Sequence, residues 1–202
     1  LQKVAKMVAP SGSEKEVLDL WSNEISAYVS DTYSTSLGNV VAIKHGTCDC
    51  RKKIMLTAHA DEIGLIITYI DNDGFLYFNE IGGIDTNILL GRRVVIRGIN
   101  GIVNGVIGVK PVHLQERGNG KQNLSPEDLW IDINVKNRQE AQELVQIGCV
   151  ATLASDFSVR GSRITGKAMD NRCSMAVLLA IAKNLYNVNV DNDIYYVATV
   201  QE

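Results

Sequence analysis

The 202-residue chain has no feature that would place it in a membrane or on nucleic acid. No apolar stretch approaches the roughly 20 residues that span a bilayer, and the chain begins without a signal-peptide pattern. The formal net charge of −3 gives no general attraction to nucleic acid or to anionic lipid. We therefore expect a cytoplasmic protein with neither a membrane nor a nucleic-acid partner.

Cysteine is scarce, and its spacing does not form a structural zinc site. Cys48 and Cys50 form a C-x-C pattern in "HGTCDCRK", the predicted tip of a hairpin, with His45 close by. A metal site there is one alternative, but no second ligand pair follows at a useful spacing. Solvent-facing thiols are the favoured interpretation. Cys149 and Cys173 have apolar neighbours and are predicted to be small core residues.

The two ends of the chain, residues 1–64 and 161–202, predict an α/β domain. "SGSEKEVLDLWSNEISAYVS" predicts a helix that begins with a capping box from Ser13 to Glu16. "DTYSTS" and "NVVAIK" predict a hairpin that turns at Gly38. "KKIMLTAHA" and "DIYYVATVQ" are near-continuous apolar runs, which predict strands covered on both faces. "CSMAVLLAIAKNLY" is apolar nearly all round and predicts a buried helix.

The middle of the chain, residues 65–160, is rich in predicted strands. Short β-prone segments alternate with turn sequences such as "DNDG", "GINGIVNG" and "ERGNGKQN", and "NRQEAQELVQ" predicts one helix. This pattern predicts a small barrel or sandwich inserted into the α/β domain. The sequence stops directly after a strand predicted to be central, so we expect the chain to be the N-terminal part of a longer protein.

His59 and Asp61 lie in "AHADEIG", at the end of a predicted strand. Residues two apart in a strand face the same side, and a metal-binding imidazole usually donates its second N–H to a carboxylate. By itself the pattern is weak, because a lone His beside an apolar run is more often structural. Glu62 faces the opposite side, so we expect it to make a structural hydrogen bond rather than to bind metal.

Two more carboxylates follow strand-like segments. Asp170 lies in "GKAMDNR", between "SRITG" and the predicted buried helix, where ligand sites of α/β proteins gather. The alternative is a helix N-cap, which either Asp170 or Asn171 would serve. Glu202 comes directly after the last predicted strand. His59, Asp170 and Glu202 thus fall at strand ends of one predicted parallel sheet, and their imidazole and carboxylate ligand atoms suit zinc, cobalt or manganese.

The motifs "AHADEIG", "GKAMDNR" and "TVQE", in this order and separation, resemble the M42 family of metallo-aminopeptidases, of the glutamyl and tetrahedral aminopeptidase type. "KPVHL" at 110–114 and "VQIGCVAT" at 145–152 resemble that family's inserted domain. The resemblance implies a three-layer zinc-peptidase-like catalytic domain, incomplete at its C-terminus, formed by residues 1–64 and 161–202. It also implies a β-barrel-like dimerisation domain at 65–160 and a homo-oligomer, a dodecamer built from dimers.

The resemblance assigns a role to each site residue. His59 would bind one of two divalent metal ions, zinc or cobalt first and manganese as an alternative. Asp170 would bridge both ions, and the Asp170–Asn171 peptide would be cis. The catalytic residues would be Asp61, which orients His59, and Glu202, the general base. The family's further ligands fall beyond this chain, so we expect the chain alone to hold metal weakly and to be inactive.

The predicted function is that of a metal-dependent aminopeptidase, which removes N-terminal residues from peptides with a metal-activated water. One alternative is a non-catalytic assembly or binding protein that kept the fold and lost the site. Another is a relative named an endoglucanase. Glycosidases need two carboxylates that flank the sugar bond, and a His-x-Asp pair has no part in that chemistry. The sequence does not indicate which N-terminal residue is preferred.

Overall fold

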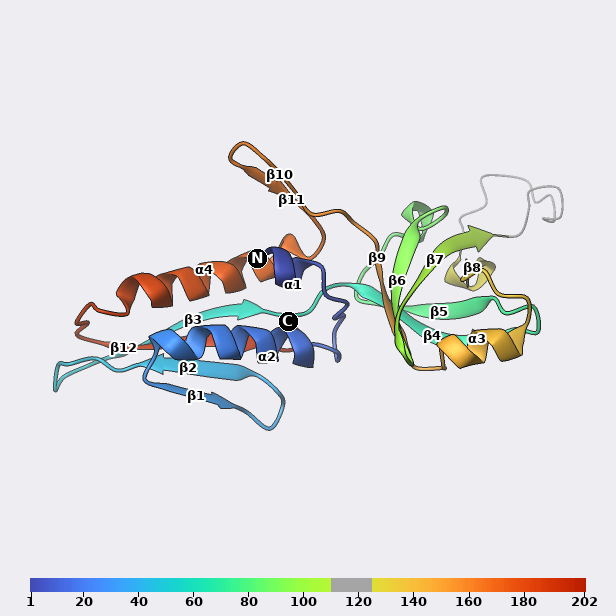
Figure 1. Cartoon of the computed structure of the whole chain (residues 1–202). Coiled ribbons are helices and arrows are strands. Elements are labelled where there is room, and N and C mark those ends of the chain that lie inside the picture. Colours follow the sequence, from blue (N-terminus) through green and yellow to red (C-terminus); the bar gives the residue numbers. More distant parts are fainter. Residues whose placement is uncertain (110–124) are drawn as a thin grey trace. The chain divides into compact units, whose positions relative to one another are not determined.

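The computed structural model describes residues 1–109 and 125–202, and the "KPVHL" motif and the "ERGNGKQN" turn lie outside them. The chain divides into two compact units (Figure 1). One unit consists of Leu1–Glu62 and Ser155–Glu202, and the other of Ile63–Ala154. The second unit is a single stretch of sequence, so the chain leaves the first unit once and returns to it once. The fold is α/β with an inserted closed β-barrel.

The first unit contains a four-stranded mixed sheet with the strand order β1-β2-β12-β3. β12 runs parallel to β3 and antiparallel to β2, so the expectation of one parallel sheet holds only for the β3–β12 pair. β1 and β2 form the predicted hairpin, and Gly38 turns it with a φ of 103° that favours glycine. The strands are β1 (Asp31–Ser34), β2 (Val40–Lys44), β3 (Lys53–His59) and β12 (Asp193–Thr199).

Helices α2 (Lys15–Ile25) and α4 (Met169–Leu185) share one core with this sheet, and Trp21 joins them by donating its Nε1–H to the carbonyl of Met175 at 3.0 Å. The described part of the unit therefore shows two of the three expected layers. The cap position of α2 is Glu14 rather than the predicted Ser13. The short helices are α1 (Gln2–Ala5) and η1 (Ser26–Tyr28).

Two predictions of complete burial were wrong. β12 is central and buried as predicted, but β3 is the edge strand of the described sheet, so Met55 is 67% exposed. α4 buries one stripe of side chains against the sheet, while Val177 and Cys173 on its other sides are exposed. Apolar composition shows that a segment is suited to burial. It does not show how many of its sides are covered in the described residues.

The second unit is a barrel that closes in the strand order β4-β5-β8-β7-β6-β9. Closure pairs every strand on both edges, and apolar side chains such as Leu65, Ile96 and Ile131 fill the inside. The strands are β4 (Gly64–Ile70), β5 (Leu76–Ile81), β6 (Arg93–Gly98), β7 (Gly101–Val109), β8 (Leu129–Asp132) and β9 (Val150–Leu153). The helical elements are α3 (Arg138–Leu144), which was predicted, and the single turns η2 (Thr86–Ile88) and η4 (Pro126–Asp128).

After the barrel, a two-stranded hairpin of β10 (Ser158–Arg160) and β11 (Arg163–Thr165) leads the chain to α4. Across the described residues, 1–109 and 125–202, no helix has the length and apolar character needed to cross a membrane. The cytoplasmic location stays a prediction.

Asp193, the first residue of β12, fixes the loop between β2 and β3. Its carboxylate accepts the Gly46 N–H at 2.9 Å and pairs with Arg51 Nε at 3.1 Å. The Gly46 hydrogen bond first, and then the charge of Arg51, lower the pKa of this carboxyl below its ordinary value of 3.8, against the opposing effect of burial. The contacts favour the charged form, so they stabilise the fold only while Asp193 is ionised.

We predict that Asp193→Asn lowers the urea midpoint of unfolding at pH 7. A carboxyl with a depressed folded-state pKa adds stability that is complete above the unfolded value, 3.8, and is lost as the pH falls through the folded value. The difference in urea midpoint between wild type and Asp193→Asn should therefore become smaller as the pH drops below 3.8. Asp156→Asn, at an exposed position, is the control. A difference in urea midpoint that does not change with pH contradicts the stabilising role assigned to the ionised Asp193.

Candidate active site

The imidazole of His59, at the end of β3, lies between two carboxylates. Nδ1 is 3.0 Å from Asp61 Oδ1, and Nε2 is 3.0 Å from Asp170 Oδ1. An ionised Asp61 can only accept hydrogen bonds, so the neutral imidazole of His59 carries its proton on Nδ1. The lone pair of Nε2 then faces Asp170. Two facing atoms that both carry lone pairs are suited to a cation. The structure thus brings together three of the four predicted site residues.

Asp61 is the best-held carboxylate of the site, with its side chain only 6% exposed. Oδ1 accepts the Glu202 backbone N–H at 3.2 Å in addition to its contact with His59, and Oδ2 accepts the hydroxyl of Ser11. Its donors come from the end of β3, from the loop before α2 and from the segment after β12. Sequence reasoning missed Ser11, because a Ser shortly before a helix is ordinarily interpreted as part of a cap.

Asp170 lies at the beginning of α4, and the Asp170–Asn171 peptide bond is cis, as predicted. The cap position of α4 is Ala168, which has a left-handed φ of 53° and no side-chain capping hydrogen bond. Asp170 (φ −86°, ψ 107°) and Asn171 (φ −124°, ψ 25°) have non-helical backbone angles, so the continuous part of α4 begins after them and the N-cap alternative stays open. The carboxylate of Asp170 faces His59, and its side chain is 91% exposed. It is consequently open to solvent on the sides that His59 does not cover.

Glu202 reaches the site through its backbone. Three successive amides after β12 donate to side chains of three separate segments: Val200 N to Asn39 Oδ1 at 2.9 Å, Gln201 N to Glu14 Oε1 at 3.0 Å, and Glu202 N to Asp61 Oδ1 at 3.2 Å. Residue 202 itself is exposed. These contacts fix the main chain of Glu202 beside Asp61, and its role as a base remains a prediction.

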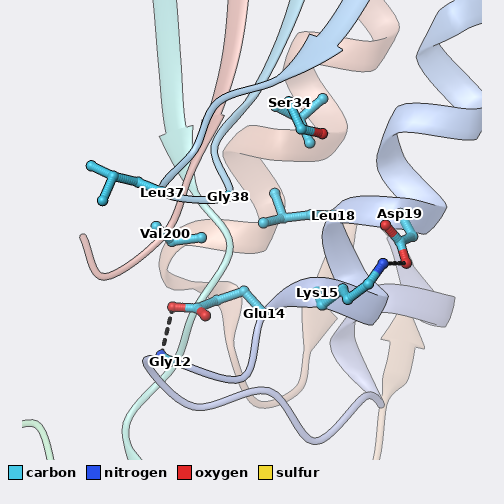
Figure 2. Close-up of a pocket in the computed structure, with 10 residues that line it drawn as sticks. Gly12, Glu14, Lys15, Leu18, Asp19, Ser34, Leu37, Gly38 and Val200 are labelled. Atoms are coloured by element: carbon cyan, nitrogen blue, oxygen red, sulfur yellow. Dashed lines mark hydrogen bonds and ion pairs between the residues drawn. The ribbon is translucent and has the colours of Figure 1, made fainter.

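A cavity of about 320 Å³ lies beside this segment (Figure 2). Glu14 and Gly12 both line it, and Figure 2 shows the Glu14 carboxylate directed at Gly12, whose N–H its Oε1 accepts at 2.8 Å. Leu18 and Val200 supply apolar lining, and the lining residues do not include His59 or Asp170. Glu14 is therefore a structural carboxylate that ties the loop before α2 to the strand end leading to Glu202.

Behind the site, Glu62 forms a buried ion-pair cluster with two cations. Its Oε1 lies 2.6 Å from Lys167 Nζ and 3.0 Å from Arg172 Nη2, and it also accepts the Ala9 N–H at 3.4 Å. Burial lowers the pKa of Lys167, and the neighbouring Glu62 charge opposes that effect. Glu62 is thus a structural residue, as predicted, although its partners are charged side chains as well as a backbone amide.

The guanidinium of Arg172 is fully buried. It donates to four backbone carbonyls, those of Ala60, Val4, Met7 and Ala9, at 2.8–3.1 Å. Burial lowers its pKa, while Glu62 acts in the opposite direction. Arg172 is two residues after Asp170, and Ala60 directly follows His59. The cluster therefore joins the two chain segments whose side chains meet at the site. Sequence reasoning did not identify this role.

The donor set fits part of a metal centre. His59 Nε2 and Asp170 Oδ1 are borderline and hard ligand atoms, which suit zinc, cobalt or manganese. Within residues 1–109 and 125–202, however, no group of three or more His, Cys, Asp or Glu side chains is arranged to hold a metal ion. Catalytic zinc typically takes three protein ligands and a water. The described residues therefore offer two facing ligands rather than a complete set.

We predict that Arg172→Met destabilises the first unit by about 3–5 kcal/mol, because it removes the buried guanidinium that pairs with Glu62 and donates to four carbonyls. The stability of Arg172→Lys should lie between those of wild type and Arg172→Met, since one ammonium group cannot reach all of these acceptors. Urea unfolding followed by Trp21 fluorescence measures the loss. Arg160→Met, on the exposed β10, should stay within about 0.5 kcal/mol of wild type. An equal loss of stability in Arg172→Met and Arg160→Met would refute the structural role assigned to Arg172.

Comparison with known proteins gives a consistent result. Residues 38–202 match the family M42 glutamyl aminopeptidase. A protein of Acetivibrio thermocellus is 39% identical over 202 residues, which is 100% of this chain and 57% of that protein. An aminopeptidase of the archaeon Desulfurococcus kamchatkensis has a TM-score of 0.90 at 36% identity, with 100% of this chain and 54% of that one covered.

The TET1 peptidase of Pyrococcus horikoshii, which can assemble into a tetrahedron or a large octahedral shell, has a TM-score of 0.86 at 32% identity. The alignment covers 99% of this chain and 59% of that one. The chain thus spans little more than half the length of these relatives. The family match includes His59, Asp170 and Glu202, and by this match the chain belongs to the M42 family of aminopeptidases.

Proposed function

We propose that the protein containing this chain is a metal-dependent aminopeptidase that removes N-terminal residues from peptides. The observation that carries the proposal is the imidazole of His59 held between Asp61 and Asp170, at 3.0 Å from each, in a chain of the M42 family. A hydrolase of this class needs a nucleophile better than water, and a metal site is a common means of producing one.

His59 Nε2 and Asp170 Oδ1 would hold the metal, with two divalent ions as the proposed complement and zinc or cobalt ahead of manganese. When bound, such ions lower the pKa of a bound water and stabilise the developing oxyanion. Asp61 accepts the Nδ1–H of His59 and so keeps the Nε2 lone pair directed away from the protein interior. Asp61 thereby orients the ligand without binding metal itself.

Glu202 is the proposed general base, which would take a proton from the attacking water and return it to the leaving amine. Its backbone N–H on Asp61 supports this role, because one carboxylate then positions both the ligand His59 and the base. With only two facing ligands among the described residues, we expect residues 1–202 alone to hold metal weakly and to lack peptidase activity.

The test uses the whole protein with a panel of aminoacyl chromogenic substrates, each assayed with zinc, cobalt and manganese. We expect turnover in wild type, loss of about 100-fold or more in His59→Ala, Asp170→Asn and Glu202→Gln, and a 10–100-fold loss of metal affinity in Asp61→Asn. Asp156→Asn, at an exposed position of the same unit, should retain wild-type activity.

An intact, folded protein that hydrolyses none of these substrates with any of the three metals would favour the non-catalytic assembly protein. Hydrolysis of a glucan that survives His59→Ala would favour the endoglucanase alternative, because that reaction does not use the His59–Asp61 pair. Activity that survives both His59→Ala and Asp170→Asn would show that the ligands are misassigned.

The barrel, residues 63–154, is the proposed dimerisation unit of a dodecamer built from dimers. Apolar side chains are exposed on it, including Ile99 and the 60%-exposed Ile102, which flank the β6–β7 turn, and Ile88, Leu90 and Ile147. Exposed apolar side chains of this size are candidates for contacts between subunits. The assembly of the Pyrococcus horikoshii relative into a tetrahedron supports the same proposal.

We predict that the whole protein is oligomeric at micromolar concentration and that Ile99→Glu with Ile102→Glu lowers its mass, because charge is costly in an apolar interface. Light scattering measures the mass. Leu37→Glu, at an exposed turn of the other unit, is the control that changes charge without changing the barrel. A monomeric wild type would rule out the proposed assembly, and an unchanged mass in the double variant would rule out this part of the barrel as the contact.

A further inference from the structure

The loop between β2 and β3 holds two thiols close together on an anchored frame. Thr47 N donates to Val190 O at 2.8 Å, and Lys52 N donates to Asn192 Oδ1 at 2.9 Å, so both ends of the loop are tied to the segment before β12. Between these anchors the Arg51 N–H donates to the Cys48 carbonyl at 3.2 Å and closes a turn. The turn carries Cys48 at its start and Cys50 two residues later.

The two sulfur atoms are 2.6 Å apart, and the Cys50 N–H donates to Cys48 Sγ at 3.3 Å. The two side chains therefore face each other across the turn. Both cysteines are free thiols, Cys50 is exposed and Cys48 is partly buried. Bond formation between the sulfurs therefore needs only a small side-chain movement, and one of the two is open to a reagent in solution.

A metal site explains these thiols less well. His45 is the nearest further donor in the sequence, but its Nε2 lies 2.8 Å from Asp31 Oδ2 and its Nδ1 lies 3.6 Å from Asp193 Oδ1. Both ring nitrogens thus already face carboxylates. Among the described residues no group of three or more candidate ligands includes the cysteines. The contact between Cys48 Sγ and Cys50 Sγ is therefore the basis for a function of these thiols.

We propose that Cys48 and Cys50 form a reversible redox site, which a low-molecular-weight disulfide such as oxidised glutathione closes and a thiol reopens. The deprotonated Cys50 sulfur attacks one sulfur of oxidised glutathione, which forms a mixed disulfide and releases one glutathione thiolate. The deprotonated Cys48 sulfur then attacks Cys50 Sγ, which forms the Cys48–Cys50 bond and releases the second glutathione thiolate. The protein loses two protons and two electrons, and one glutathione disulfide becomes two thiols.

The order of the two attacks follows from access. Cys50 is exposed and can meet the bulky reagent, whereas Cys48 is partly covered and already in contact with the Cys50 sulfur. In a reducing compartment such a pair stays open and closes only when oxidant accumulates. The site lies at the beginnings of β3 and β12, whose other ends lead to His59 and Glu202. It is therefore separate from the proposed active site.

The test exploits the sequence around the thiols. Trypsin cleaves after Lys44 and Arg51, so both cysteines fall in one peptide, "HGTCDCR". The whole protein is incubated with oxidised glutathione, free thiols are alkylated, and the digest is analysed by mass spectrometry. We expect this peptide to lose two hydrogen atoms and to take no alkyl group, and to regain both thiols after treatment with dithiothreitol.

Three variants decide the outcome. Cys149→Ser/Cys173→Ser should close the loop as fully as wild type, because neither residue takes part. Cys48→Ser should instead retain a stable glutathione adduct on Cys50, and Cys50→Ser should accumulate at least ten-fold less adduct on the partly covered Cys48. The proposal is overturned if wild type accumulates the Cys50 adduct without closing, if both thiols remain alkylatable, or if the bond forms between two chains.

Discussion

The carboxylate of Asp61 is the constraint on which the candidate site depends. A charge buried to this degree is stable only if hydrogen-bond donors replace the lost water, and Asp61 receives three, from His59, Ser11 and Glu202. These donors belong to three segments that are far apart in the sequence. Satisfying one charge therefore brings the segments together, and it fixes the tautomer of His59 in the same contact.

Arg172 also joins separate segments through a buried charge, but it contacts residues 60–62 from the interior rather than from the site. Asp61 faces the site, while the neighbouring Glu62 faces the interior and meets Arg172 and Lys167. Alternation along an extended backbone explains why adjacent acids have such different surroundings. The Arg172 side chain also binds the carbonyls of the N-terminal segment, so the loop that carries Ser11 and the helix that carries Asp170 are held by the same buried group.

The sequence was sufficient to predict the strand ends that lead to His59 and Glu202, because a polar residue directly after an apolar run is unusual. Asp170 was wrongly placed at an end of the same sheet, since it follows the separate β10–β11 hairpin and lies at the beginning of α4. His59, Asp61 and Asp170 meet as predicted, and the inserted barrel follows from regularly spaced turns. Ser11 and Arg172 were not predictable in this way. Their roles arise from contacts across 50 and 112 residues, which local patterns do not encode. The exposure of β3 was missed for a similar reason, since composition does not reveal which strand lies at an edge.

The inserted barrel also affects the order in which the molecule can form. Its residues, 63–154, are contiguous, so the barrel can close while later residues are still being synthesised. The contacts of the site span 111 residues between His59 and Asp170 and 141 between Asp61 and Glu202. Until β12 (Asp193–Thr199) has been synthesised, β3 therefore lacks its parallel partner strand. An exposed apolar strand edge of this kind is prone to pair with other chains, so the nascent first unit is open to such pairing during the synthesis of the barrel and of α4.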